Sequence, residues 1–366
     1  MTLLRNLALL AACIAPALSQ TWSDCNPTED DGCQPDAALG TSHFWGFNET
    51  LDEKLWNATT GEIKYTDDGA EFTIASKLQS PTLQSTFYIF GGILEFHAKM
   101  AKGGGIVSSV VLQSDDLDEI DWEWVGYNTT QIQTNYYSKG VTDYDNGGFY
   151  YVDNADTEWH NYTTHWTQEK LEWWVDGELL RTLTYDDAKN GTESTFPQTP
   201  CNIRFGIWPA GDPKNPIGTI EWAGGEVDYD AGPYTMYIKD VRIEDFNIGS
   251  KEYEYSDKTG SWDSINIIKG NSTAQKEINK APEKSLSEKW DDLPSGAKAG
   301  VYVGAAAAGS ILLALFIFFY IRQRKKGRLE HALADDKFNS ERNEMNNFQN
   351  NWKQSEWKNG GYQPVK

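Results

Sequence analysis

The sequence of 366 residues predicts an all-β fold, an antiparallel β-sandwich or barrel in one domain, followed by one C-terminal transmembrane helix. From about residue 42 to 247, short runs rich in Val, Ile, Thr and aromatic residues alternate with turns of Gly, Asp and Asn. This region has no long helical period. A long uncharged apolar stretch follows at 299–321. These three observations predict packed antiparallel sheets and then a membrane helix.

The predicted strands share a length of a few residues and a high content of β-branched and aromatic side chains. They include AEFTIAS (70–76), GILEFHAKM (92–100), GIVSSVVLQ (105–113), TQIQTNYYS (130–138), LEWWVDGELLRTLTY (171–185), CNIRFGIWP (201–209) and YTMYIKDVRIEDF (234–246). Within residues 171–185, Asp176-Gly177 is the dipeptide preferred in tight two-residue turns, so we expect a β-hairpin there.

The first 19 residues are typical of a secretory signal peptide. Arg5 precedes an apolar run, and small residues at Ala17 and Ser19 mark a cleavage site, so we expect the mature chain to begin near Gln20. Residues 299–321 are long enough to span a bilayer, and the basic segment 322–328 follows at once. The positive-inside rule then predicts a type I membrane protein, with residues 20–298 outside.

Two polar segments flank the predicted span. Residues 249–298 are rich in Lys, Glu, Ser and Asp, and we expect an extended stalk rather than packed structure. Residues 322–366 are predicted to be a disordered cytoplasmic tail, whose aromatic residues either bind a partner or make no fixed contact. A lipid-anchor signal is the alternative to the span, but its hydrophobic segment normally ends the chain.

Charge and cysteine content agree with a secreted domain. The net charge is −22, which disfavours binding to nucleic acid, and the basic tail means that the acidity lies in the predicted extracellular part. Cys13 lies in the signal peptide. Cys25 and Cys33 flank a short polar loop and should form a disulfide, which leaves Cys201 unassigned.

Six N-glycosylation sequons support the same compartment. They begin at Asn48, Asn57, Asn128, Asn161, Asn190 and Asn271.

The segment DEIDWEWVG (118–126) carries the candidate active site. Alternate residues of a strand point to the same face, so Glu119, Asp121 and Glu123 share one face. The large apolar residues between them, such as Trp122, share the other face and can pack into the sheet. No basic residue is interleaved with the acids. Crowded carboxylates raise one another's pKa, and glycoside hydrolysis needs one protonated and one ionised carboxyl group.

Two other interpretations of the acid row remain open at this point. The row could be a solvated polar strand face, although such faces more often mix Lys, Thr and Ser with the acids. It could also bind calcium, although calcium sites usually take their ligands from a loop rather than from a strand with bulky Trp residues. We favour catalysis, and we expect no metal and no cofactor.

The acid strand resembles the catalytic strand of glycoside hydrolase family 16, a group of β-jelly-roll enzymes that act on β-glucans and related polymers. The resemblance extends over roughly residues 22–247, and several blocks are similar to the Crh subgroup of fungal cell-wall transglycosylases. These blocks are CNPTEDDGCQPDAALG (25–40), TNYYSKG (134–140), WHNYTTHWTQEKLEWWVDGELLRTL (159–183) and RFGIWPAGDPKNPIGTIEWAGGEVDY (204–229). The resemblance implies a concanavalin-like jelly roll in residues 20–248.

The same resemblance implies a role for each acid. Glu119 would be the nucleophile, Glu123 the general acid and base, and Asp121 would hold Glu119 by a hydrogen bond. The two working carboxyl groups of a retaining enzyme lie about 5–5.5 Å apart. Their Cα atoms would be roughly 13 Å apart on a straight strand, so we expect the strand to curve or the side chains to lean inward.

The resemblance also points to sugar-binding residues beside the acids: Asn135, Tyr137, Trp208 and Trp222. Core packing is the alternative for each Trp. Weaker candidates are Gln113, Thr219 and Glu221. We interpret His160 and His165 as structural residues rather than as metal ligands.

Retaining chemistry leaves the acceptor open, because water gives a hydrolase and a second sugar chain gives a transglycosylase. The Crh-like blocks favour transfer of a chitin donor to β-glucan or chitin acceptors in a fungal cell wall. The alternatives are an endo-β-glucanase and a non-catalytic receptor that binds the wall. Crh-like proteins are often lipid-anchored and some carry a Cys-rich chitin-binding module, whereas this chain is predicted to use a helical span.

Overall fold

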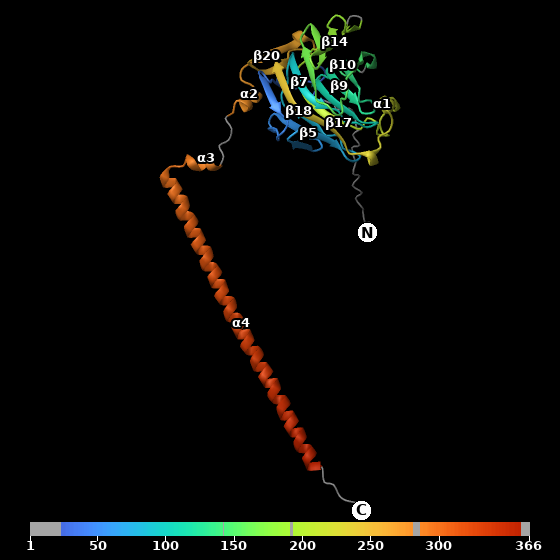
Figure 1. Cartoon of the computed structure of the whole chain (residues 1–366). Helices are drawn as coiled ribbons and strands as arrows, with labels where there is room; N and C mark the ends of the chain where they lie inside the picture. The colour runs from blue at the N-terminus through green and yellow to red at the C-terminus, as the bar shows by residue number, and fades with distance from the viewer. Residues whose placement is uncertain (1–22, 142, 191–192, 281–285, 360–366) are drawn as a thin grey trace, which may run out of the picture. The chain divides into compact units, whose positions relative to one another are not determined.

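A computed structural model describes residues 23–141, 143–190, 193–280 and 286–359 of the chain (Figure 1). The predicted signal peptide and its cleavage site lie outside these residues. The chain forms two compact units, residues 1–280 and 281–366. The first unit contains every described strand, and all strand pairings in it are antiparallel.

Two large sheets form the body of this first unit, as predicted. The seven-stranded sheet has the order β11 (Gly148–Tyr151), β10 (Gln131–Tyr137), β9 (Glu119–Val125), β8 (Val107–Ser114), β17 (Cys201–Trp208), β6 (Thr82–Ser85) and β3 (Trp56–Thr60). The eight-stranded sheet has the order β14 (Glu178–Thr184), β13 (Lys170–Val175), β12 (His160–Trp166), β7 (Gly92–Lys99), β18 (Tyr234–Asp245), β5 (Gly69–Ile74) and β4 (Ile63–Thr66), and β2 (Ser42–Gly46) also pairs with β18.

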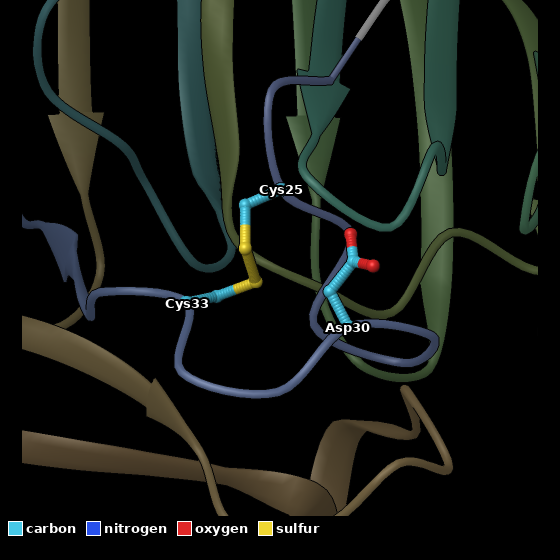
Figure 2. Close-up of side chains that lie close together, drawn as sticks. All are labelled: Cys25, Asp30 and Cys33. Carbon is cyan, nitrogen blue, oxygen red and sulfur yellow. A yellow bond between two sulfur atoms is a disulfide. The ribbon is translucent and has the colours of Figure 1, made fainter.

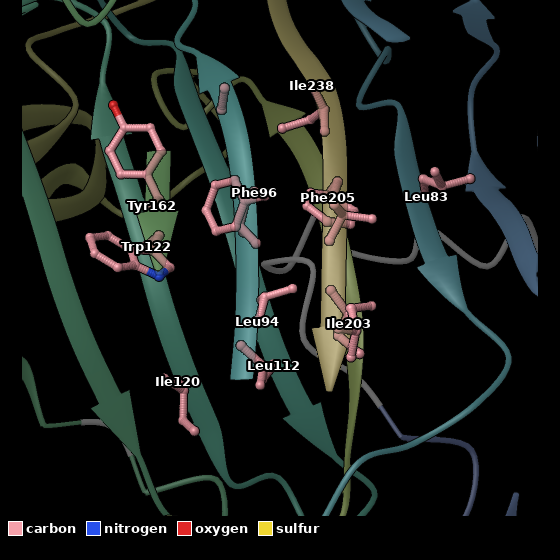
Figure 3. Close-up of a cluster of buried hydrophobic side chains, with 14 of the residues drawn as sticks. Leu83, Leu94, Phe96, Leu112, Ile120, Trp122, Tyr162, Ile203, Phe205 and Ile238 are labelled. Carbon is pink, nitrogen blue, oxygen red and sulfur yellow. The ribbon is translucent and has the colours of Figure 1, made fainter. Parts of the chain in front are cut away.

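The core lies between these two sheets, and Figure 3 shows part of it. Strand β9 contributes Ile120, Trp122 and Trp124, which are at most 1% exposed. The Trp124 ring meets the Tyr162 ring of β12 edge to face, with centroids 4.9 Å apart. The Trp122 Nε1–H donates to Thr164 Oγ1 of the same strand over 2.8 Å. The apolar face of β9 therefore anchors this strand to the opposite sheet.

The predicted hairpin is confirmed between β13 and β14. Val175 pairs with Glu178, and the two residues between them form the turn. Asp176 and Gly177 have φ angles of 51° and 82°, the left-handed conformation that a tight primed turn requires.

A third sheet corrects the predicted boundary of the domain. Strand β19 (Ser250–Tyr255) pairs with β1 (Asp36–Ala37) and β20 (Ile265–Lys269), and helix α2 (Thr273–Ile278) follows. The Tyr253 side chain is fully buried. The expectation of an unpacked stalk from residue 249 is therefore wrong for this part of the chain, because a few apolar side chains in a polar segment are enough to dock it.

Among these side chains, Trp262 makes the most extensive aromatic contact. Its ring stacks on Phe90 with centroids 4.1 Å apart and meets Trp166 edge to face at 5.7 Å. Both partners belong to the sandwich, so the segment after β18 is an integral part of the domain.

The remaining elements are short, apart from one helix. Strands β15 (Lys189–Asn190) and β16 (Glu193–Ser194) pair with each other, and helix α1 (Ile217–Trp222) follows β17. In the second unit, α3 (Leu286–Asp291) precedes α4 (Ser295–Asn359). Helix α4 includes the predicted span and, among the described residues, is the helix long and apolar enough to cross a membrane.

Helix α4 also bears on the predicted tail. The expectation of disorder from residue 322 differs from the structure, in which the helix continues to Asn359. This segment is rich in Glu, Lys, Arg and Gln, which have high helix propensity, and ion pairs such as Lys326–Glu330 at spacing i, i+4 support the helix.

The packing of Tyr253 gives a test of the domain boundary. Replacing it by Ala removes a buried aromatic ring, so we expect Tyr253→Ala to lower the free energy of unfolding by about 3–5 kcal/mol. Denaturant unfolding followed by tryptophan fluorescence measures the change. The exposed Phe44 serves as a control, because Phe44→Ala should change stability by less than about 0.5 kcal/mol. Equal effects of the two substitutions would contradict the packing of residues 250–278 against the sandwich.

Candidate active site

The three acids lie on the outer face of the seven-stranded sheet, which we call the acid face. Strand β9 positions them, because the residues between them are locked in the core. In strand β10, Tyr137, Asn135 and Gln133 pair with Glu119, Asp121 and Glu123 respectively. In strand β8, the partners of the same three acids are Gln113, Val111 and Ser109. Since directly paired residues point to the same side, all of these side chains belong to the acid face.

Two of the predicted sugar-binding residues are therefore next to the acids. The Asn135 Nδ2–H donates to the Tyr137 hydroxyl over 2.7 Å, and the Asn135 side chain is only 1% exposed. This bond fixes the orientation of both groups beside Glu119 and Asp121. Gln113, a weaker candidate, also lies beside Glu119 and is fully buried.

Desolvation dominates the electrostatics of the acid row. Burial raises the pKa of Asp121 to about 7. Burial also raises the pKa of Glu123 to about 8, and the charge of Asp121 adds to this shift. Asp121 Oδ1 has no hydrogen-bond partner among the described residues. A carboxyl group with a pKa of about 8 is protonated at neutral pH, which is the state a general acid requires.

Arg204 of β17 is a functional candidate that the sequence did not indicate. Its side chain is 2% exposed, and its Nε–H donates to Asn202 Oδ1 over 2.9 Å. Burial lowers the pKa of this guanidinium, and the nearby acidic groups of Glu119 and Asp115 act against that change. The acid face thus holds a buried cation that interacts electrostatically with Glu119.

Trp208 and Trp222 form the hydrophobic part of the acid face. Trp208 ends β17 and Trp222 ends α1, and their ring centroids are 6.1 Å apart. Both rings are only partly buried and pack on a small cluster that contains Val107 and Val125. The Trp222 Nε1–H donates to Gln133 Oε1 over 2.8 Å, which ties this ring to the strand residue beside Glu123.

The remaining candidates lie outside the seven-stranded sheet. Thr219 and Glu221 belong to α1. His160 and His165 are on β12 in the opposite sheet, where their Nδ1 atoms lie 2.7 Å from Asp176 Oδ2 and 3.1 Å from Glu172 Oε2. These hydrogen bonds give both histidines a structural contact.

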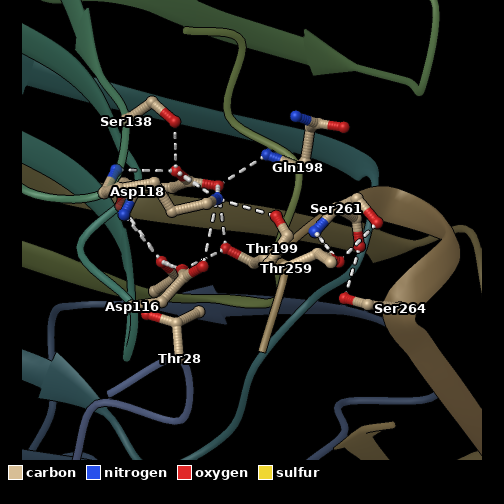
Figure 4. Close-up of polar contacts among 12 residues, drawn as sticks. Thr28, Asp116, Asp118, Ser138, Gln198, Thr199, Thr259, Ser261 and Ser264 are labelled. Atoms are coloured by element: carbon tan, nitrogen blue, oxygen red, sulfur yellow. Dashed lines mark hydrogen bonds and ion pairs between the residues drawn. The ribbon is translucent and has the colours of Figure 1, made fainter. Parts of the chain in front are cut away.

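A buried ionic cluster supports the turn that leads into β9 (Figure 4). The Lys139 Nζ lies 3.1 Å from Asp116 Oδ2 and 3.1 Å from Asp118 Oδ1. It also donates to the Gly260 carbonyl over 2.7 Å, while the Gln198 backbone N–H donates to Asp118 Oδ2 over 2.7 Å. Both carboxylates are fully buried, so these bonds stabilise the start of the acid strand.

The predicted disulfide is confirmed, and the state of the unassigned cysteine is now defined. Cys25 and Cys33 form a disulfide with a Cα–Cα distance of 5.7 Å, and Cys201 is a buried free thiol. The Asp30 carboxylate lies close to the two sulfur atoms (Figure 2). Sulfur atoms in a disulfide are not thiolates, so this group is a structural staple rather than a metal site.

The predicted glycosylation sites differ in exposure. Asn48, Asn57 and Asn271 are exposed. Asn128 and Asn161 are half-buried, and the Asn161 Nδ2–H donates to Glu95 Oε1 over 2.7 Å. Asn190 lies in β15. Modification of these residues remains a prediction.

Comparison with known proteins agrees with this geometry. The family model of the glycosyl hydrolases family 16 matches residues 51–224. The chain is 62% identical to Crh-like protein 3 of Aspergillus fumigatus over 366 residues, which cover 100% of both chains. It is 48% identical to Congo red hypersensitive protein 1 of Saccharomyces cerevisiae over 244 residues, which cover 66% of this chain and 47% of that protein.

Solved structures give the same result. The structure described as apo Crh5 transglycosylase is 49% identical, with a TM-score of 0.63, and covers 66% of this chain and 100% of its own. A second structure, described as Crh5 transglycosylase in complex with NAG, is 48% identical with the same TM-score and covers 66% of this chain and 99% of its own. The chain therefore belongs to glycosyl hydrolase family 16 and, within that family, to the Crh-like proteins.

The raised pKa of Glu123 makes a prediction about stability. An unfolded Glu has a pKa near 4.3, so between about pH 4 and pH 8 the folded state holds the extra proton, and stability falls as the pH rises through this window. Gln cannot ionise. We therefore expect Glu123→Gln to raise Tm at pH 8, with the gain shrinking toward pH 4.

Thermal unfolding across this pH range tests the prediction. Glu178→Gln, on the exposed end of β14, is the matched control and should leave Tm unchanged at every pH. A gain for Glu123→Gln that is the same at pH 4 and pH 8 would rule out the titration of Glu123 as its cause.

Proposed function

We propose that this protein is a retaining transglycosylase of the fungal cell wall that cleaves a β-1,4-linked chitin donor and transfers it to β-glucan or chitin. The observation that carries the proposal is the acid row, in which a rigid strand presents one carboxyl group kept protonated by burial and another close to a buried cation. The relatives described as transglycosylases support transfer over hydrolysis. A non-catalytic receptor would not require this electrostatic arrangement.

The first chemical step uses Glu119 and Glu123. A carboxylate oxygen of Glu119 attacks the anomeric carbon of the donor, and the bond to the leaving sugar breaks. The electron pair of that bond stays on the leaving oxygen, which takes the proton of Glu123. The product is a glycosyl ester of Glu119, and Glu123 is now ionised.

In the second step an acceptor hydroxyl group attacks the same anomeric carbon. Glu123 removes the hydroxyl proton, and the ester bond breaks to restore the Glu119 carboxylate. Two inversions give retention of configuration. Asp121 lies between the two residues, and we assign it to the orientation of Glu119. Asn135, Tyr137, Trp208 and Trp222 bind the sugars next to the reacting bond.

The N-terminal and C-terminal segments support a location of this reaction outside the membrane. Residues 1–19 direct secretion, residues 299–321 within α4 span the membrane, and the basic segment from 322 keeps the C-terminal part in the cytoplasm. The catalytic domain then faces the wall polymers, and the disulfide between Cys25 and Cys33 suits this oxidising side.

Substitution of the two glutamates tests the roles assigned to them. We expect Glu119→Gln to abolish the transfer of chitin oligomers to a fluorescent glucan oligomer, because the glycosyl ester cannot form. Glu123→Gln should slow the transfer by roughly 10²–10⁴-fold, the usual contribution of general acid–base catalysis. Glu178→Gln is again the matched control and should keep full activity.

The products of this assay separate the possible functions. Labelled hybrid chains indicate a transglycosylase, whereas only shortened chains would indicate a hydrolase. Binding of the oligomers without any product from the unmodified protein would contradict both enzymatic functions.

The pH dependence of kcat/KM gives an independent test. Glu123 must be protonated to act as the acid, so activity should decline above a pH close to its pKa of about 8. A donor with a leaving group that needs no proton should lose this alkaline decline. If both donors show the same decline, another group is responsible for it.

A further inference from the structure

Aromatic side chains on the acid face continue beyond the acid row to the edge of the sheet. Edge strand β11 alternates in exposure, with Phe149 54% and Tyr151 71% exposed, while Tyr150 between them packs against the core. Phe149 and Tyr151 therefore project from the same side of the strand. Two large aromatic side chains at alternate positions of one exposed edge form a patch rather than single scattered residues.

Strand register connects this patch to the acids. Phe149 pairs with Gln133, and Gln133 pairs with Glu123, so all three side chains lie on the acid face. Tyr151 pairs with Gln131 on the same side. Two strand spacings of about 4.8 Å place Phe149 roughly 10 Å from Glu123 across the sheet.

Gln133 also joins the patch to the tryptophans already described. Its Oε1 accepts from the Trp222 Nε1–H over 2.8 Å, and its strand partner on the other side is Phe149. Trp208 on β17, Trp222 next to Gln133, and Phe149 and Tyr151 on β11 thus place rings across the acid face, from the β17 side of the acids to the sheet edge at β11. We call these four residues the aromatic strip.

The opposite edge of the same sheet has a different character. There Arg204 pairs with Gln84 of β6, and Gln84 pairs with Asn57 of β3. These polar side chains offer hydrogen bonds but no ring face. The two edges of the acid face therefore differ, and rings for stacking extend toward β11.

We propose that the outer end of the aromatic strip, Phe149 and Tyr151, binds a stretch of the polysaccharide chain remote from the reacting bond by stacking on its sugar rings. The inference rests on the proposed function, because it takes the acid row as the place of reaction. The axial hydrogens of β-linked glucose and N-acetylglucosamine give each ring an apolar face, which suits an exposed aromatic ring. The occupant is a sugar chain because the patch is continuous with the face on which the sugar reacts.

The subsite proposed at Phe149 and Tyr151 can be tested by comparing the binding of short and long oligosaccharides. The full chain in detergent carries Glu119→Gln to stop turnover, and calorimetry measures the binding of a chitin disaccharide and of a chitin hexasaccharide. We expect Phe149→Ala and Tyr151→Ala each to weaken hexasaccharide binding roughly 5- to 10-fold, the loss expected for one aromatic stacking contact. Binding of the disaccharide beside the acids should change less than about twofold.

Two further variants control for indirect effects. Phe44→Ala removes an aromatic side chain of similar exposure from β2 of the other sheet and should change neither affinity. Phe149→Trp keeps a ring and should restore hexasaccharide binding. Equal losses for both oligosaccharides, or no loss for either, would overturn the proposal. A changed oligomeric state in Phe149→Ala with unchanged sugar affinity would also overturn it, in favour of a second copy as the occupant.

These outcomes differ from those that would refute the proposed function. Binding is measured without turnover, so the length dependence can be read whatever reaction the protein catalyses. Full transfer activity in the Glu119→Gln variant would contradict the assigned nucleophile, and it would leave the comparison between Phe149→Ala and Phe44→Ala intact.

Discussion

The burial of one face of strand β9 is the constraint on which the candidate active site depends. Ile120, Trp122 and Trp124 are locked in the core, so the acids between them can only lie on the outer face. A slip of one residue in register would put the three acids in the core and the two tryptophans outside, at a large cost in free energy. The packing that holds the sandwich together therefore also fixes the spacing of the three acids.

The surroundings of the acids then change their electrostatic properties. Neighbouring strands cover Asp121 and Asn135 almost completely, and this desolvation raises the pKa of Asp121 and Glu123. Arg204 supplies a positive charge near Glu119 from β17. Three acids on one strand thus meet different surroundings, as the proposed roles of a general acid and a nucleophile require.

How far the sequence predicts this arrangement depends on the range of each interaction. Alternation along β9 and the Asp176-Gly177 turn are local patterns, so both faces of the strand and the hairpin could be predicted. Arg204 could not be found in this way, because it lies 85 positions after Glu119 and only the sheet order brings the two together. The packing of residues 250–278 was missed because Tyr253 and Trp262 are few among polar residues, and because the buried positions of β19, Ser250 and Tyr253, do not follow the period-two alternation of a half-buried strand.

The acid row does not determine whether water or a sugar acts as the acceptor. In the mechanism proposed above, Glu123 would remove a proton from either acceptor with the same geometry, so the acids would accelerate both reactions. The outcome depends on how long a sugar hydroxyl group stays near the glycosyl ester compared with water. Binding energy from remote parts of a substrate contributes to catalysis by holding the reacting group in place. Residues distant from the acids, on the face that the sugar chain crosses, therefore determine whether such a protein joins chains or only cuts them.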